Sequence, residues 1–313
     1  MKVEKLLENI RPSPESTVTV KKMGNITEVR YMQRKTGGII KKIDRDNFVD
    51  TRTGEVKDFK HSDVRIENIE SISRSLRNLR DIINTNVTDV KKCLWVTLTY
   101  SENQRDSVKL YNDYRTFNMR FQRFLKNKGL LKCEYIAAAE PQGRGAWHLH
   151  VIYIFPHKAP FIENSTLSAL WGHGFVSVSS LKNIDNVGVY LSAYLSDMDV
   201  LKALNTVNFE NKNIKIVTSD GKSDNRRKKS IIKGARLRLY PTGFRIYRLS
   251  RGIKKPETYE TTEAEAMQRI SGAALTYEKT VQLSDDGNII NQINYRHFNK
   301  KAKKIKVIKE ELM

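Results

Sequence analysis

The chain has 313 residues, of which 39% are hydrophobic, enough apolar material for a sizeable core. Its 56 Lys and Arg against 35 Asp and Glu leave a net charge of +21, which favours a polyanionic partner, most often nucleic acid, over a solvated or ribosome-type basic surface. The only cysteines, Cys93 and Cys133, lie in apolar runs, and the longest apolar stretch, VIYIF, has about five residues, so we expect a cytoplasmic protein with reduced thiols that is neither secreted nor membrane-bound.

Residues 1–90 form a basic N-terminal region broken by turns, a possible DNA-binding arm. STVTVKK, NITEVRYMQRK and GGIIKKI alternate in the manner of short strands. A helix is predicted over SISRSLRNLRDIINTN, because its apolar residues recur at helical spacing. Arg74, Arg77 and Arg80 lie on the other side of this helix, where they either face solvent or contact phosphates.

Residues 91–200 have a compact α+β pattern. CLWVTLTY indicates a buried strand, and the helix over residues 110–128 ends at Gly129. Two further strands, EYIAAAE and WHLHVIYIF, are linked by the hairpin turn PQGRGA. After them come a short helix, STLSALWG, an apolar segment, FVSVSSL, and a second helix, NVGVYLSAYLSDM. We therefore expect an antiparallel sheet with helices packed against it.

Residues 201–313 form a basic C-terminal region that we expect to contact DNA or to complete the sheet. NKNIKIVTSDGKSDNRRKK is typical of a basic loop, and a basic run, KKAKKIKVIK, lies near residue 313. Between them, residues 233–252 alternate Leu with Arg around a Tyr-Pro-Thr-Gly turn. This pattern predicts a hairpin with a basic, DNA-contacting face that carries Arg236, Arg238 and Arg245.

Two histidines in the second of the paired strands point in the same direction. Side chains at i and i+2 of a strand leave on one face, so His148 and His150 lie together. Glu140 ends the preceding strand, and a tight turn would return its carboxylate beside the imidazoles. Two imidazoles and one carboxylate suit a divalent ion with open positions, such as Mg²⁺ or Mn²⁺. The alternative is that these are ordinary core histidines with satisfied hydrogen bonds.

Two tyrosines lie one helical turn apart. Tyr190 and Tyr194 share a face at the edge of the apolar stripe of their helix, for which Asp185 or Asn186 is a suitable N-cap. A tyrosine hydroxyl, with an ordinary pKa near 10, is a poor nucleophile, but beside a divalent metal it can attack a phosphodiester and form a phosphotyrosine. The alternative is a pair of core tyrosines at helical spacing.

These motifs together carry a family resemblance. TLTY at 97–100, Glu140 followed by HLH at 148–150, and YLSAY at 190–194 resemble the three ordered motifs of the HUH endonuclease superfamily, and most closely the rolling-circle replication initiators (Rep proteins) of bacterial plasmids and small single-stranded DNA phages. The resemblance implies a central five-stranded antiparallel sheet flanked by helices, with the histidine strand at its centre and basic extensions at both ends of the chain.

The resemblance also implies roles for individual residues. Glu140, His148 and His150 would be metal ligands, and Thr97 and Thr99 would support the site as part of the first motif. Tyr190 and Tyr194 would be the nucleophiles, one of which becomes linked to the 5′ phosphate of nicked DNA. Such initiators usually carry a lysine just before the second tyrosine, where this chain has Ala193, so another basic residue, with Lys182 as a candidate, would take its place or the lysine is dispensed with.

The expected function is therefore initiation of rolling-circle replication by a metal-dependent endonuclease and strand transferase. Its partners would be single-stranded and origin DNA together with a host helicase and polymerase, since the sequence has no G-x-x-x-x-G-K-[ST] loop; its oligomeric state stays open. One alternative keeps the chemistry in a relaxase or a single-strand transposase. Another is a non-catalytic DNA-binding regulator, which would have no use for the ligand triad and the tyrosines.

Overall fold

The structure of the chain, a computed structural model, describes residues 2–58 except 36–39, 45 and 52, residues 69–199 except 183 and 185, residues 216–219, and residues 229–302 except 233, 242 and 286. The chain packs into two compact units. Unit 1 consists of residues 1–61 and 256–313, and unit 2 of residues 62–255. The functional regions expected at 1–90, 91–200 and 201–313 stay predictions, and the packing itself joins the two ends of the chain in unit 1.

Unit 1 is built on a six-stranded antiparallel sheet in the order β1-β16-β17-β3-β2-β15. Its strands and helix are β1 (Lys2–Lys5), β2 (Thr17–Met23), β3 (Ile26–Met32), β15 (Glu257–Thr262), α6 (Glu263–Arg269), β16 (Ala274–Asp285) and β17 (Asn288–Asn299). Helix α6 covers a small core formed by Val18, Val20, Val29, Ala266 and Ile270. Strands β4 (Ile40–Lys42), β5 (Asn47–Asp50) and β6 (Val56–Asp58) form a separate three-stranded sheet.

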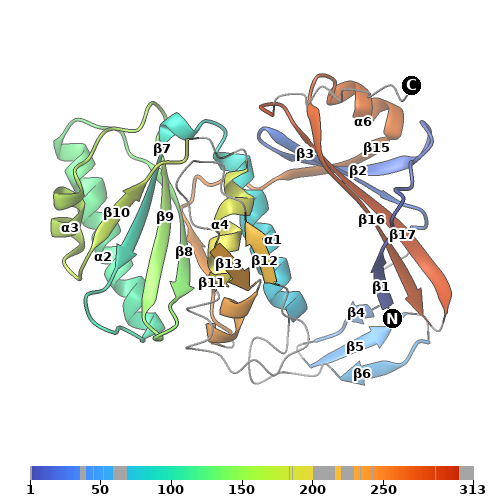
Figure 1. The fold of residues 1–313 in the computed structure, drawn as a ribbon, viewed down its shortest axis with the longest axis horizontal. Helices are drawn as coiled ribbons and strands as arrows, with labels where there is room; N and C mark the ends of the chain where they lie inside the picture. The colour runs from blue at the N-terminus through green and yellow to red at the C-terminus, as the bar shows by residue number, and fades with distance from the viewer. Residues whose placement is uncertain are drawn as a thin grey trace. The chain divides into compact units, whose positions relative to one another are not determined.

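Unit 2 is built on a five-stranded antiparallel sheet in the order β10-β7-β9-β8-β14 (Figure 1). Its strands are β7 (Cys93–Thr99), β8 (Glu134–Pro141), β9 (Trp147–Ile154), β10 (Val176–Ser179) and β14 (Tyr247–Leu249). Its helices are α1 (Ile69–Asn86), α2 (Ser107–Asn127), α3 (Asn164–Trp171) and α4 (Val187–Ser196), with short 3-10 turns at η2 (Val90–Lys92) and η3 (Ala235–Leu239). A third sheet joins β11 (Met198–Asp199), β13 (Lys229–Ile232) and β12 (Ile216–Ser219).

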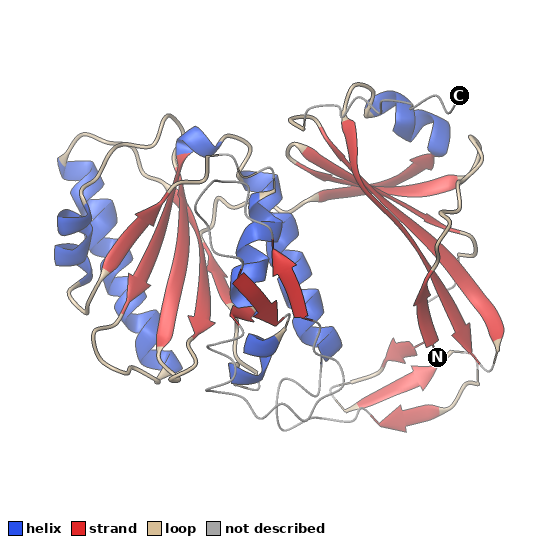
Figure 2. Ribbon diagram, viewed as in Figure 1, coloured by secondary structure: helices blue, strands red, loops and turns tan. Residues whose placement is uncertain are grey.

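The helices of unit 2 cover both faces of the five-stranded sheet (Figure 2). One face packs on α2, where the Phe121 and Tyr153 rings lie 4.6 Å apart, and α3 lies against α2 through Phe117 and Trp171. The other face packs on α4, whose Tyr190 and Tyr194 contact Trp95 of β7, and α1 lies behind α4. His148 and His150 belong to this second face, because side chains alternate along β9.

The sequence correctly predicted the fold class and most elements of unit 2. A mixed α+β structure with antiparallel sheets is confirmed, as are the helices at α1 to α4 and the β8–β9 hairpin. The described residues form sheets of six, five, three and three strands, so a single central five-stranded sheet is not confirmed for the chain as a whole. Among these residues, no helix is both long enough and apolar enough to span a membrane.

The predicted hairpin over residues 233–252 is wrong. Ala235–Leu239 forms a 3-10 helix, and only Tyr247–Leu249 is a strand, which completes the sheet beside β8. At three residues per turn, Leu237 and Tyr240 face the same side, and both are buried, which a strand at this place would not allow. The predicted basic loop is wrong at Ile216–Ser219, which is a strand; the rest of it up to residue 228, and the terminal basic run beyond residue 302, lie outside the described residues.

Candidate active site

Strand register brings the predicted metal ligands together. In the β8–β9 ladder Glu140 lies opposite His148, and Ala138 lies opposite His150, so the two histidines and the carboxylate leave the same face of the sheet. The turn that makes this possible closes with a hydrogen bond from the Gln142 amide to the Ala146 carbonyl oxygen at 2.7 Å. The hairpin thus returns the carboxylate to the histidines as the sequence predicts.

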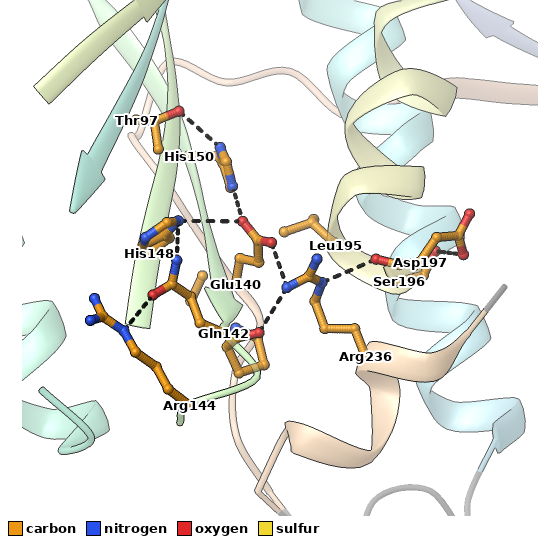
Figure 3. Close-up of polar contacts among 12 residues, drawn as sticks. Thr97, Glu140, Gln142, Arg144, His148, His150, Leu195, Ser196, Asp197 and Arg236 are labelled. Carbon is orange, nitrogen blue, oxygen red and sulfur yellow. Dashed lines mark hydrogen bonds and ion pairs between the residues drawn. The ribbon is translucent and has the colours of Figure 1, made fainter. Parts of the chain in front are cut away.

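The three side chains form a compact cluster (Figure 3). His150 Nε2 is hydrogen-bonded to Glu140 Oε2, and His148 Nδ1 lies 3.8 Å from the same oxygen. The three potential ligand atoms all lie within 4.8 Å of one another. Glu140 is 6% exposed and His150 is 4% exposed, so the cluster is a buried polar site and could hold a metal ion.

Neighbouring side chains orient the histidines. The Thr97 hydroxyl, which lies opposite His150 on β7, is 3.1 Å from His150 Nδ1. A hydroxyl can donate or accept, so Thr97 can support either His150 tautomer, one that donates to Glu140 or one that offers the Nε2 lone pair to a metal ion. The Gln142 amide lies 3.3 Å from His148 Nδ1. Thr99 lies opposite His148, and its carbonyl oxygen accepts a hydrogen bond from the Trp171 indole at 3.0 Å.

One buried nitrogen in the cluster lacks a partner. His148 Nε2 has no hydrogen-bond partner among the residues that the structure describes. A buried polar atom of this kind is costly unless something else satisfies it. Two imidazoles and a carboxylate, with one ring nitrogen free of protein partners, therefore fit a divalent metal ion or a polar group of a substrate.

The cluster keeps its imidazole and carboxylate in metal-binding protonation states. Burial, only partly opposed by Glu140, lowers the pKa of His148 to about 4, so this imidazole is neutral near pH 7. Burial by itself raises the pKa of the Glu140 carboxyl. The hydrogen bond to His150 and the charge of Arg236 outweigh burial and bring the pKa below its ordinary value, so the carboxylate is ionised.

Arg236 is part of this site. Its Nη1 lies 2.6 Å from Glu140 Oε1 and donates to the Pro141 carbonyl oxygen at 3.0 Å, while its Nε donates to the Asp197 carbonyl oxygen at 3.2 Å (Figure 3). Asp197 is the residue that follows α4. Arg236 therefore holds the outer oxygen of Glu140, leaves the inner one facing the histidines, and ties the end of the tyrosine helix to β8.

Helix α4 lies against the cluster because its packing on α1 is very close. The Asn186 side chain caps the helix by accepting from the Val189 amide, and Asn84 of α1 accepts from the Gly188 amide at 3.0 Å. A Cβ atom at position 188 would lie 2.5 Å from the Arg80 carbonyl oxygen. Only glycine allows the two backbones to approach in this way.

Both tyrosines of α4 face the site. The Tyr190 and Tyr194 rings each pack edge-on against Trp95 with centroids 5.5 Å apart, and they lie 5.2 Å from each other. Tyr194 also contacts His150, at 5.9 Å between ring centroids. The two residues are 39% and 44% exposed, so they are not core tyrosines. A hydrogen bond with Tyr190, together with burial, raises the pKa of Tyr194 to about 12, so its hydroxyl is protonated at neutral pH.

The basic residues proposed from the sequence to bind DNA are dispersed. Arg74 and Arg77 are exposed on α1, and Arg245 and Lys182 are also exposed. Arg80 is half-buried and pairs with Asp81 at 2.9 Å. The surface contact expected of Arg236 is wrong, since this side chain is buried at Glu140; the side chain of Arg238 lies outside the described part of the chain.

Two residues of the site were missed or misplaced by sequence reasoning. Trp95 contacts His150 and both tyrosines, and its spacing of two residues from Thr97 on β7 was the available signal that it faces the site. Arg236 approaches from a segment about 100 residues away from Glu140 in the sequence, and no local pattern shows such a contact.

Comparisons with known proteins give one match. A family model of replication-associated proteins, of the ORF2 type, matches residues 93–199, about a third of the chain. No curated protein and no solved structure matches the chain. The matched segment runs from β7 to the end of β11, so it contains Thr97, the Glu140–His148–His150 cluster and the tyrosine helix. This similarity supports a Rep-like, replication-associated protein.

Proposed function

We propose that the protein is a rolling-circle replication initiator of the HUH type, a metal-dependent enzyme that nicks and rejoins one DNA strand at an origin. The observation that carries this proposal is the packing of two half-exposed tyrosines beside a buried carboxylate and two imidazoles on one sheet face. A protein that only binds DNA has no need of this arrangement. The match to replication-associated proteins over the same residues, and the net charge of +21, support a DNA substrate.

The triad and the tyrosines would divide the work between them. Glu140, His148 and His150 would hold Mg²⁺ or Mn²⁺, which when bound polarises the scissile phosphate and offsets its developing charge. Arg236 and Thr97 keep two of these side chains in their orientations.

The chemical step is an exchange of one phosphodiester for another. The Tyr194 hydroxyl loses its proton and forms an Oη–P bond, the P–O3′ bond breaks, and the leaving 3′ oxygen takes up a proton. The 5′ phosphate is then joined to the tyrosine, and the free 3′-OH is available to a host polymerase, with a host helicase to unwind the duplex. Attack of a 3′-OH on the phosphotyrosine reverses the step, so rejoining needs no ATP. We assign the first attack to Tyr194 because its ring contacts His150.

A labelled single-stranded DNA pool tests the proposal. A random-sequence oligonucleotide pool with a 3′ fluorophore is incubated with the protein and Mn²⁺ or Mg²⁺, then separated on a denaturing gel. The label should move with the protein, because the tyrosine retains the 5′ phosphate of the 3′ fragment, and EDTA should abolish the adduct. Sequencing of the trapped fragments would then identify the recognised site.

Variants separate the two hydroxyls. Tyr194→Phe should lose the adduct and Tyr190→Phe should retain it, while the double variant is the fully inactive control. The absence of an adduct from the wild-type protein with either metal would refute the nicking function and favour a DNA-binding regulator. An adduct that persists in the double variant would show that another residue is the nucleophile.

A further inference from the structure

The site face of the five-stranded sheet has an open margin along β10. Exposure alternates along this edge strand: Val176 is buried in the core, whereas Phe175, Ser177 and Ser179 are exposed. The register pairs Ser177 with Thr97, and Thr97 with His150. Since directly paired residues point to the same side of a sheet, the exposed side of β10 is the side that carries the triad.

Phe175 lies in the same cross-strand row as two triad residues. The hydrogen bond from the Thr99 amide to the Phe175 carbonyl oxygen, 2.9 Å long, extends the β10–β7 ladder by one residue and places Phe175 opposite Thr99. Thr99 lies opposite His148, and His148 opposite Glu140. With neighbouring strands about 4.8 Å apart, the backbone of Phe175 lies roughly 10 Å from that of His148.

The backbone that carries Phe175 is firmly placed. Gly174 has a φ of 148°, and a Cβ at this position would lie 2.5 Å from both the Ser101 amide nitrogen and the Thr99 carbonyl oxygen. The Ser101 amide also donates to the His173 carbonyl oxygen at 2.9 Å. The close approach at Gly174 therefore fixes the ring of Phe175 to the edge of the site instead of leaving it on a free loop.

The ring is nevertheless open to solvent. Phe175 is 75% exposed, and no aromatic ring of the described residues packs on it. A single exposed apolar residue is common on protein surfaces and carries no function by itself. What distinguishes Phe175 is an exposed aromatic face in the row of the catalytic cluster, on a protein of net charge +21.

We propose that Phe175 is a stacking platform for a base of single-stranded DNA next to the phosphate held at the Glu140–His148–His150 cluster. This inference rests on the proposed nicking function and adds to it the position of the strand. Every base has a π-face, so aromatic stacking binds unpaired bases with little sequence preference. The small exposed side chains of Ser177 and Ser179 leave space along β10, and their hydroxyls suit contacts with the sugar-phosphate backbone.

Binding measurements without chemistry test this role. Anisotropy of a fluorescein-labelled, random-sequence single-stranded oligonucleotide is measured in EDTA, where no nicking occurs. Phe175→Ala should weaken binding by about 5- to 100-fold, the effect of removing one base stack. Phe175→Trp should bind as tightly as the wild type, whereas Phe175→Leu, which is apolar but has no ring, should resemble Phe175→Ala.

The chain offers a matched control. Phe161 is 90% exposed in the segment that follows β9 and has no place in the ladder rows, so Phe161→Ala should change the dissociation constant by less than about two-fold. Binding of a blunt duplex, whose bases are already stacked, should not change in Phe175→Ala. The thermal midpoints of all variants should match the wild type, since the substituted side chains are exposed.

The outcomes separate this inference from the function on which it rests. If the wild type forms the covalent adduct but Phe175→Ala binds single strands as tightly as Phe161→Ala, the stacking role is refuted and the nicking function remains. If Phe175→Leu binds as the wild type does, apolar contact and not stacking explains the position. If the wild type neither binds single strands nor forms the adduct, both proposals fail.

Discussion

Replacing Arg236 with methionine should destabilise unit 2 by about 3 kcal/mol, because it leaves the Glu140 carboxylate buried without its cation. Only 13% of the Arg236 side chain and 8% of the Glu140 side chain are exposed, so water cannot replace the lost charge. Methionine preserves much of the volume of the arginine stem, which separates the loss of charge from the loss of packing.

The expected magnitude follows from the contacts. Removal of one partner of a buried ion pair costs about 3–5 kcal/mol. We place this change at the lower end because His150 remains hydrogen-bonded to Glu140 after the substitution. Glu140→Gln removes the charge from the other side, and the double variant should lose less than the sum of the two single changes, with a coupling of about 1–3 kcal/mol.

Urea unfolding followed by tryptophan fluorescence measures this effect in the full-length protein. All three tryptophans, Trp95, Trp147 and Trp171, belong to unit 2, so the signal reports the unfolding of that unit. EDTA in the buffer keeps a metal ion from replacing the lost cation. Exposed Arg251 provides the control, and Arg251→Met should shift stability by less than about 0.5 kcal/mol. If Arg236→Met costs no more than this control, or if the double variant is additive, Arg236 does not compensate the Glu140 charge.

Three further outcomes follow from the same packing. Gly188→Ala should cost about 1–3 kcal/mol in the urea assay, because the new methyl group meets the Arg80 backbone; an unchanged midpoint would mean that α1 and α4 are farther apart. Mn²⁺ at 100 times its dissociation constant should stabilise the protein by about 2.7 kcal/mol, and a His148→Ala variant that responds equally would place the ion elsewhere. Burial raises the pKa of the Cys93 and Cys133 thiols to about 12, so at pH 8 roughly one in 10⁴ is a thiolate, and a thiol reagent should label them quickly only after unfolding.

Several contacts hold the metal-binding strand and the tyrosine helix at a set separation. Tyr240, buried beside η3, donates to the Ala139 carbonyl oxygen of β8 at 2.8 Å and approaches the Leu195 carbonyl oxygen of α4 at 3.1 Å. Arg236 and Trp95 bridge the same two elements from other directions. The segment that follows the family match thus supports the site that the match contains, so residues 235–240 should be kept in any shortened form of the enzyme.

The sequence by itself determined which side chains share a face. A period of two places His148 and His150 on one side of β9, the PQGRGA turn returns Glu140 beside them, and a helical period aligns Tyr190 with Tyr194. These relations are local, since each depends on neighbouring residues and on backbone geometry alone. They were enough to predict a metal-ligand cluster and a pair of tyrosines, but not the distance between them.

Tertiary structure decided the rest, because the remaining contacts join segments far apart in the chain. Strand β3 pairs with β17, more than 250 residues later, and no periodicity within either segment shows that pairing. The Leu-Arg alternation near Arg236 matches a strand, yet burial of Leu237 and Tyr240 favours a 3-10 turn that points Arg236 at Glu140. The row from Phe175 to Glu140 likewise exists only through the register of four strand segments. Local pattern assigns a side chain to a face, but only the packing of distant segments determines what that face meets.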